Sequence, residues 1–123
     1  KPHKVPLSDQ TAELIDGIMA AHNYPFIFHG RNPEKPLSNM AMLSLLKRRF
    51  KDVDSTVHGF RSTASTLLNE SRKWHPDVIE RQLAHVEGNK VRAAYNHAEY
   101  LDERREMMQW WADKLDEFKE CST

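Results

Sequence analysis

Cysteine and long apolar runs are what this sequence has least of. The single cysteine, Cys121, cannot form an internal disulfide, so a reducing, cytoplasmic setting is expected. The longest apolar run is a few residues, which excludes a membrane span of ~20 residues and a secretory signal. The 123 residues suffice for one compact domain. Because residue 1 is Lys rather than Met, we expect the chain to begin inside a longer protein.

Motifs for metal, phosphate-loop and serine chemistry are also missing. None of the seven histidines has a Cys or Glu partner at the close spacing of a zinc site. There is no glycine-rich phosphate loop and no serine nucleophile elbow. No metal and no cofactor are therefore expected, and a reaction of this chain would rest on ordinary side chains.

Charge is balanced in total but not along the chain. Basic and acidic residues number 18 each, yet residues 37–92 hold ten basic against six acidic side chains. Residues 93–123 hold four against eight. A uniformly basic nucleic-acid binder is excluded, but a single basic face is enough to follow a phosphate backbone.

Apolar spacing and capping residues predict a mainly α chain with a minor β element. Short strands are expected at residues 5–7 and 26–28. Helices are expected to begin at Ser8, Ser38, Ser55 or Thr56, Pro76, Asn89 and Leu101. The expected ends lie near Asn23, Phe50, Leu68, Gly88, Tyr95 and Phe118.

His58 and Arg61 are the first residues that point to chemistry. Three positions apart on a predicted helix, they share a face distinct from the apolar stripe that begins at Phe60. The Arg61 guanidinium can neutralise a phosphodiester, and His58 can hold an oxygen or move a proton near neutral pH. The ordinary alternatives are an ion pair of Arg61 with Glu70 or Glu80 and a histidine that caps the helix start.

His85 and Tyr95 complete a metal-free set for phosphodiester cleavage. His85 is either a second donor to phosphate oxygen or a histidine at a helix end, where the dipole favours it. Tyr95 is the predicted nucleophile, whose covalent phosphotyrosine conserves the bond energy and allows resealing without a nucleotide cofactor. Tyr24, in a turn before proline, and Tyr100, on another face of a continuous helix, are the rival phenols.

The predicted last helix, residues 101–118, carries a wide apolar stripe with two adjacent tryptophans. It fits packing on the chain's own core or docking on a neighbouring subunit, because Trp and Met are enriched at interfaces. Both interpretations stay open from the sequence.

Several segments resemble the tyrosine site-specific recombinases, the phage integrase family, and more narrowly the P4-type integrases of prophages and genomic islands. The segments are Pro2–Ser8, His58–Arg61, Gln82–His85 and Val91–Tyr95, and Glu103–Ala112 supports the narrower resemblance. The resemblance implies a partial tyrosine recombinase catalytic-core fold, with residues 1–123 as the C-terminal part of the catalytic domain.

The resemblance also implies roles. His58, Arg61, His85 and Tyr95 match the family's catalytic residues, and the full-length protein would act as a tetramer on double-stranded DNA attachment sites. Family members use a further Arg and a hairpin Lys, which we expect upstream of Lys1, so the chain alone is expected to be inactive. Many relatives have His after the motif Arg, where this chain has Ser62, a departure that is expected to change neighbouring contacts rather than the reaction.

Two other functions fit the same residues. A type IB topoisomerase uses similar Tyr, Arg and His chemistry to relax a single duplex, and a non-catalytic helical DNA-binding or oligomerisation module would hold Tyr95 for structure alone. Convergence of the four predicted site residues on one accessible concavity would favour an enzyme.

Overall fold

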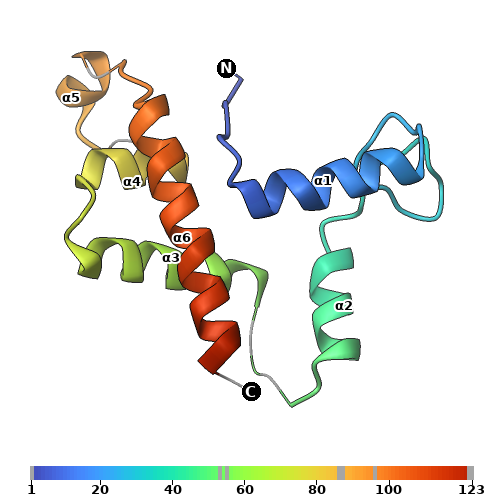
Figure 1. Ribbon diagram of the computed structural model, residues 1–123. Coiled ribbons are helices and arrows are strands. Elements are labelled where there is room, and N and C mark those ends of the chain that lie inside the picture. Colours follow the sequence, from blue (N-terminus) through green and yellow to red (C-terminus); the bar gives the residue numbers. More distant parts are fainter. Residues whose placement is uncertain (1, 53, 55, 86–87, 96, 122–123) are drawn as a thin grey trace. The chain divides into compact units, whose positions relative to one another are not determined.

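The computed structural model describes residues 2–52, 54, 56–85, 88–95 and 97–121, and six α-helices lie within them (Figure 1). In these residues the β structure is limited to an isolated antiparallel bridge between His29 and Pro36. The mainly α prediction is confirmed. The helices are α1 (Asp9–Ala21), α2 (Ala41–Arg49), α3 (Val57–Ser71), α4 (Pro76–Gln82), α5 (Lys90–Tyr95) and α6 (Leu101–Cys121).

The two predicted strands are wrong. Residues 5–7 and 26–28 form neither strand nor bridge. A strand needs a neighbour to complete its hydrogen bonds. Pro6 removes an N–H donor from the first segment, and Pro25 removes one at the position just before the second. Phe26, Ile27 and Phe28 are also exposed, so the predicted burial of that segment fails.

The chain divides into two compact units, which are described separately below. The first unit comprises Lys1–Gln10 and Ala64–Thr123, and the second comprises Thr11–Thr63. No helix in the described part of the chain combines the length and the apolar character that crossing a bilayer requires.

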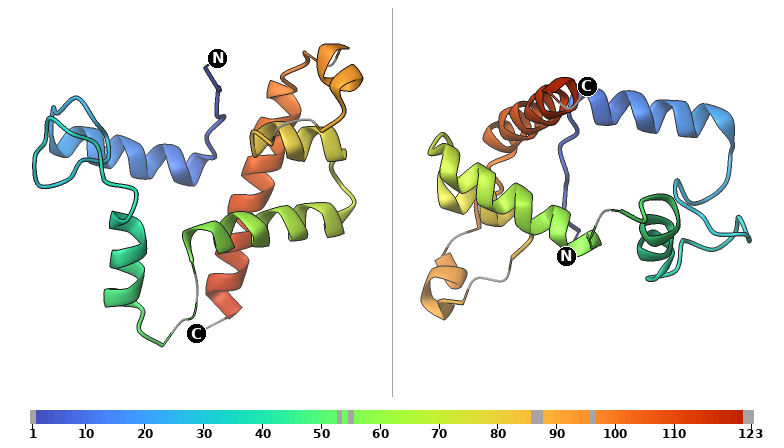
Figure 2. Two further views of the ribbon diagram at one scale, coloured as in Figure 1. Left: turned by 180° about the vertical axis from the view of Figure 1, so that it is seen from behind. Right: turned by 90° about the horizontal axis from the view of Figure 1, so that it is seen from below.

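The first unit has a buried core where α4 packs on α6. Its fully buried apolar side chains come from the end of α3, from α4 and from α6: Leu68, Val78, Ile79 and Met107. Figure 2 shows α4 and the later part of α3 on the same side of α6. Six partly buried residues enclose this core: Trp74, Leu83, Tyr100, Met108, Trp110 and Trp111. The two adjacent tryptophans thus pack on the chain's own core.

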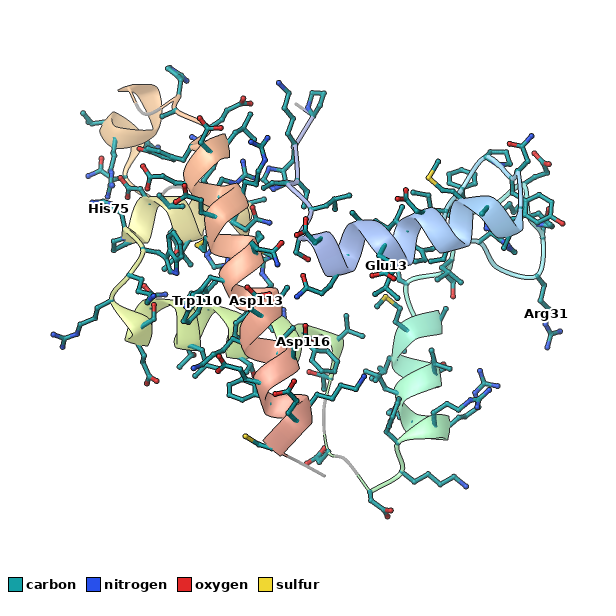
Figure 3. All side chains as sticks on the ribbon, in the orientation of Figure 1. Glu13, Arg31, His75, Trp110, Asp113 and Asp116 are labelled. Atoms are coloured by element: carbon teal, nitrogen blue, oxygen red, sulfur yellow. The ribbon has the colours of Figure 1, made fainter. Side chains whose placement is uncertain are left out.

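Polar contacts fix the N-terminal segment of the first unit to α6. The backbone N–H of Asp9 donates to Oε1 of Gln109 at 2.8 Å, and Gln109 Nε2 donates to Oε1 of Gln10 at 2.9 Å. Gln10 Nε2 in turn donates to the carboxylates of Asp113 and Asp116, at 2.8 and 2.9 Å (Figure 3). The start of α1 is therefore capped from α6 rather than by its predicted cap Ser8 alone.

The second unit has a different character, since none of its described residues is buried. Of the four predicted inward side chains of α2, Met42, Leu45 and Phe50 are exposed and Leu46 is half-buried. Ser38 does not cap α2, because the N-cap position falls at Met40, which makes no side-chain cap bond. The Ser38 carbonyl instead accepts the Ala41 N–H at 3.2 Å in a turn before the helix.

Candidate active site

His58 and Arg61 lie in the first two turns of α3, three positions apart as predicted. Thr56 caps the helix: its carbonyl and its Oγ1 both accept the Gly59 N–H, each at 3.0 Å. The other predicted cap, Ser55, lies outside the described residues. A Cβ on Gly59 would meet Thr56 Oγ1 at 3.3 Å, so glycine lets the cap close tightly. His58 is exposed and Arg61 is half-buried, both in the second unit.

His85 lies just beyond α4, at a helix end closed by a left-handed residue. Ala84 has a φ of 54°, and its N–H donates to the Arg81 carbonyl at 3.2 Å. The His85 N–H donates to the Glu80 carbonyl at 3.0 Å. These two bonds form a Schellman motif with alanine where glycine is usual. The motif turns the chain sharply after α4, and His85 leaves the helix at a fixed point.

The His85 ring is held by the same helix. Its Nδ1 lies 2.5 Å from Oε2 of Glu80, and both side chains are largely exposed. A carboxylate that engages one ring nitrogen sets the tautomer and orientation of the imidazole. The contact engages Nδ1 rather than Nε2, so Nε2 is the nitrogen that a bound phosphate would meet. Glu80 thus engages His85 within the first unit.

Tyr95 is the last residue of α5. Asn89 begins this helix, with its Oδ1 accepting the N–H groups of Val91 and Arg92 at 3.0 and 3.1 Å. The Arg92 guanidinium forms an ion pair with the Asp77 carboxylate of α4, which ties α5 to α4 within the first unit. The side chain of Tyr95 lies outside what the structure describes, so its backbone alone is placed.

The two rival phenols have other roles. The Tyr24 ring stacks on His22 with centroids 4.9 Å apart and meets His29 edge-on at 5.0 Å. Tyr100 packs against the core of the first unit, and its carbonyl accepts the Arg104 N–H at 2.8 Å at the start of α6. Tyr100 also has a φ of 51°. None of these contacts tests which phenol is the nucleophile, so Tyr95 stays the predicted one.

The structure brings together only part of the predicted set. The segments that carry His85 and Tyr95 belong to the first unit, where the Arg92–Asp77 ion pair links α5 with α4. His58 and Arg61 belong to the second unit. The convergence of all four residues therefore stays a prediction.

Sequence reasoning missed Arg104, which is 1% exposed on α6. Its Nε donates to Oε1 of Gln82 at 2.9 Å, and its two Nη atoms donate to the carbonyls of Glu99 and Lys4 at 3.1 and 2.5 Å. Burial lowers the pKa of Arg104, the nearby Arg81 lowers it further, and Glu99 opposes the change. A signal was present, because residue 104 lies three positions before buried Met107, on the apolar stripe of the helix.

One hollow of the first unit is lined by residues other than the four predicted ones. It has a volume of about 600 Å³. Its walls are Lys73, Trp74, Glu106, Gln109, Trp110 and Asp113. Within the described residues, no three His, Cys, Asp or Glu side chains are grouped so as to hold a metal ion.

Comparison with known proteins gives a consistent result. The model of the "Phage integrase family" matches residues 1–101. The chain is 48% identical over 120 residues to prophage integrase IntS of Escherichia coli and, equally, to the integrase of Shigella phage Sf6, covering 95% of the chain in both cases. It is 45% identical over 119 residues, 93% of the chain, to the integrase of Enterobacteria phage P4. The matched part is 27–31% of the length of these three relatives. No solved structure matches the chain.

Proposed function

Because the chain belongs to the phage integrase family, as its motifs predicted, we propose that the protein containing it cuts and rejoins double-stranded DNA at attachment sites. The observation that carries the proposal is the family match over residues 1–101, which includes all four predicted site residues. The similarity to integrases of prophages and of phage P4 supports site-specific integration.

The proposed reaction is a pair of phosphoryl transfers. The Tyr95 phenol gives up its proton as its oxygen attacks the scissile phosphorus, and the 3′-phosphotyrosine bond forms as the bond to the 5′-oxygen breaks. The 5′-oxygen takes up one proton and leaves as a hydroxyl, so no net proton is consumed. Arg61 and His58 donate hydrogen bonds to the phosphate oxygens, where negative charge develops, and His85 does so from Nε2 as an imidazolium whose Nδ1–H engages Glu80. A 5′-hydroxyl of the partner strand then attacks the phosphotyrosine, which restores the phosphodiester and frees Tyr95. The number of phosphoester bonds is unchanged, so no nucleotide is consumed.

The proposed partners are DNA and further copies of the protein. The excess of basic residues in 37–92 supports binding to a phosphate backbone. We propose a tetramer on two duplexes, with the C-terminal end of α6 as a subunit-docking element. Trp110 and Trp111 already pack on the core of their own chain, whereas Leu115 and Phe118 are exposed and would supply the docking surface. We place the protein in the cytoplasm, where its DNA substrate lies.

The test measures whether the full-length protein becomes covalently bound to a DNA duplex. The duplex carries the junction between the integrated prophage or genomic island and the host chromosome. A nick a few nucleotides 3′ of the cleavage point lets the short fragment that carries the freed 5′-hydroxyl diffuse away, so the adduct accumulates. We expect Tyr95→Phe to abolish the adduct and to leave DNA binding unchanged, because the phenyl ring retains the shape but not the nucleophile. The matched control, Tyr100→Phe, keeps forming the adduct.

Three outcomes separate the alternatives. An adduct with Tyr95→Phe but not with Tyr100→Phe would move the nucleophile to Tyr100. No adduct with the unaltered protein would favour a non-catalytic DNA-binding module. An adduct without strand exchange between two duplexes would favour a topoisomerase. The 123-residue chain alone is expected to form no adduct.

A further inference from the structure

Arg104 connects three segments that are far apart in the sequence. Its guanidinium reaches Gln82 at the end of α4, Glu99 before α6 and Lys4 in the N-terminal segment, all within the first unit. A second bond joins two of these segments directly, since His3 Nε2 lies 3.3 Å from the Gln82 carbonyl oxygen. One buried cation thus fixes three chain segments at one point.

Two of these contacts lie close to predicted site residues. Gln82 is three residues before His85, and Glu99 is four residues after Tyr95. Each intervening stretch is short, and the first is closed by the left-handed Ala84. A shift of the guanidinium would therefore move the start of the His85 turn and the connection that follows Tyr95 relative to each other.

The three acceptors around residue 104 require several N–H donors. They are the side-chain amide oxygen of Gln82 and the backbone carbonyls of Glu99 and Lys4. An apolar side chain of similar length would continue the stripe of α6 but would leave these acceptors without a donor. What only the guanidinium provides is five N–H donors in a rigid plane that meet several acceptors at once.

We propose that Arg104 is a positioning residue for DNA cleavage, holding the segments of His85 and Tyr95 in the mutual arrangement that the reaction needs. The inference rests on the proposed function. Arg104 does not touch the DNA; it acts through Gln82 and the Glu99 backbone. Positioning errors of about 1 Å can lower a rate by about a hundredfold, which sets the size of the expected effect.

The experiment uses the full-length protein and the nicked junction duplex described above. Arg104→Met removes the three bonds and keeps the length and apolar stem of the side chain. Arg105→Met is the matched control, because it makes the same charge change at an exposed neighbour. Arg104→Lys tests whether the planar guanidinium is needed, because one ammonium cannot reach three acceptors in that geometry. For each variant, the rate of adduct formation at saturating DNA, the Kd for the duplex and the melting temperature are measured.

We expect Arg104→Met and Arg104→Lys to slow adduct formation at saturating DNA by about ten- to a hundredfold. The Kd should change by less than about threefold, since affinity for DNA depends mainly on phosphate contacts and Arg104 makes none. Arg105→Met should match the unaltered protein in rate. An unchanged rate with Arg104→Met, or a rate that falls only in step with DNA binding or melting temperature, overturns the proposal.

A second variant keeps the test decisive if the Arg104 variants do not fold. Gln82→Met removes the α4 acceptor and leaves the guanidinium with its other two partners, so a smaller loss of rate, about three- to tenfold, is expected. An unchanged rate with Gln82→Met would then overturn the proposal. Failure of the proposed function looks different, because the unaltered protein and Arg105→Met would also give no adduct dependent on Tyr95.

Discussion

The two units of this chain hold their structure by different means. In the first unit, Ile79 and Met107 are completely buried, and polar side chains of α6 secure the N-terminal segment. In the second unit, no described residue is buried, and contacts such as Leu37 with Phe28 and His22 with His29 join residues that are close in sequence. The predicted site draws residues from both units. His85 and Tyr95 belong to the unit with a buried core, whereas His58 and Arg61 belong to the unit whose described residues include none that is buried.

Local contacts account for the order of the second unit. The Leu37 N–H donates to the Phe28 carbonyl at 3.2 Å. The ring centroid of His29 lies 5.0 Å from the ring centroids of both His22 and Tyr24. Such contacts close short loops and cost little entropy, but they remove little apolar surface from water. The second unit is therefore expected to open more readily than the first.

The largest expected contrast is between two methionines on helices. Met107→Ala should lower the free energy of unfolding of the 123-residue chain by about 2–5 kcal/mol, because it empties space in a closed core. Met42→Ala, at a side chain that is 54% exposed, should change it by less than about 0.5 kcal/mol. Urea denaturation followed by circular dichroism measures both. Equal losses at the two positions would contradict the distinction between the units.

Amide hydrogen exchange should show a smaller but more extended contrast. We expect amides in the buried part of α4 and α6 to exchange about thirtyfold more slowly than those of α2, because local opening of α2 exposes little new apolar surface. Mass spectrometry of peptides from the 123-residue chain measures this ratio. If the amides of α2 were as protected as those of α6, the expectation that the second unit is locally less stable would be wrong.

The smallest expected effect is a stabilisation at the turn before His85. Ala84→Gly should raise the free energy of unfolding by about 0.5–1 kcal/mol, because the left-handed conformation penalises a Cβ. Ala112→Gly, inside α6, is the matched control and should lower it by about 1 kcal/mol. Calorimetric melting of both variants gives the sign. A loss of stability with Ala84→Gly would mean that the turn is not left-handed in solution.

Much of the helical structure could be predicted from the sequence, because caps and apolar periodicity are local signals. Thr56, Pro76 and Asn89 each stand at the start of the predicted helix. The end of α4 was placed too late, at Gly88, because the left-handed turn uses Ala84, a residue without the preference of glycine for that conformation. Local signals therefore located helices better than they located helix ends.

The helical setting of the predicted site residues could be predicted from the sequence, but the buried arginine near two of them could not. His58, Arg61, His85 and Tyr95 followed from residue chemistry and order, and their segments lie on or beside helices as expected. Arg104 did not follow, because its partners Lys4 and Gln82 are 100 and 22 residues away. Contacts at such separations depend on the tertiary fold, and the spacing of residues along the sequence does not indicate them.

The placement of Trp74, Trp110 and Trp111 gives the chain an optical property. All three indoles belong to the first unit, and the Nζ atoms of Lys73 and Lys114 lie 5.7 and 5.9 Å from the Trp110 ring centroid. Fluorescence excited at the red edge of indole absorption therefore originates in that unit alone. A change in its colour or intensity on adding DNA can be assigned to the half that carries His85 and Tyr95, with no dye attached.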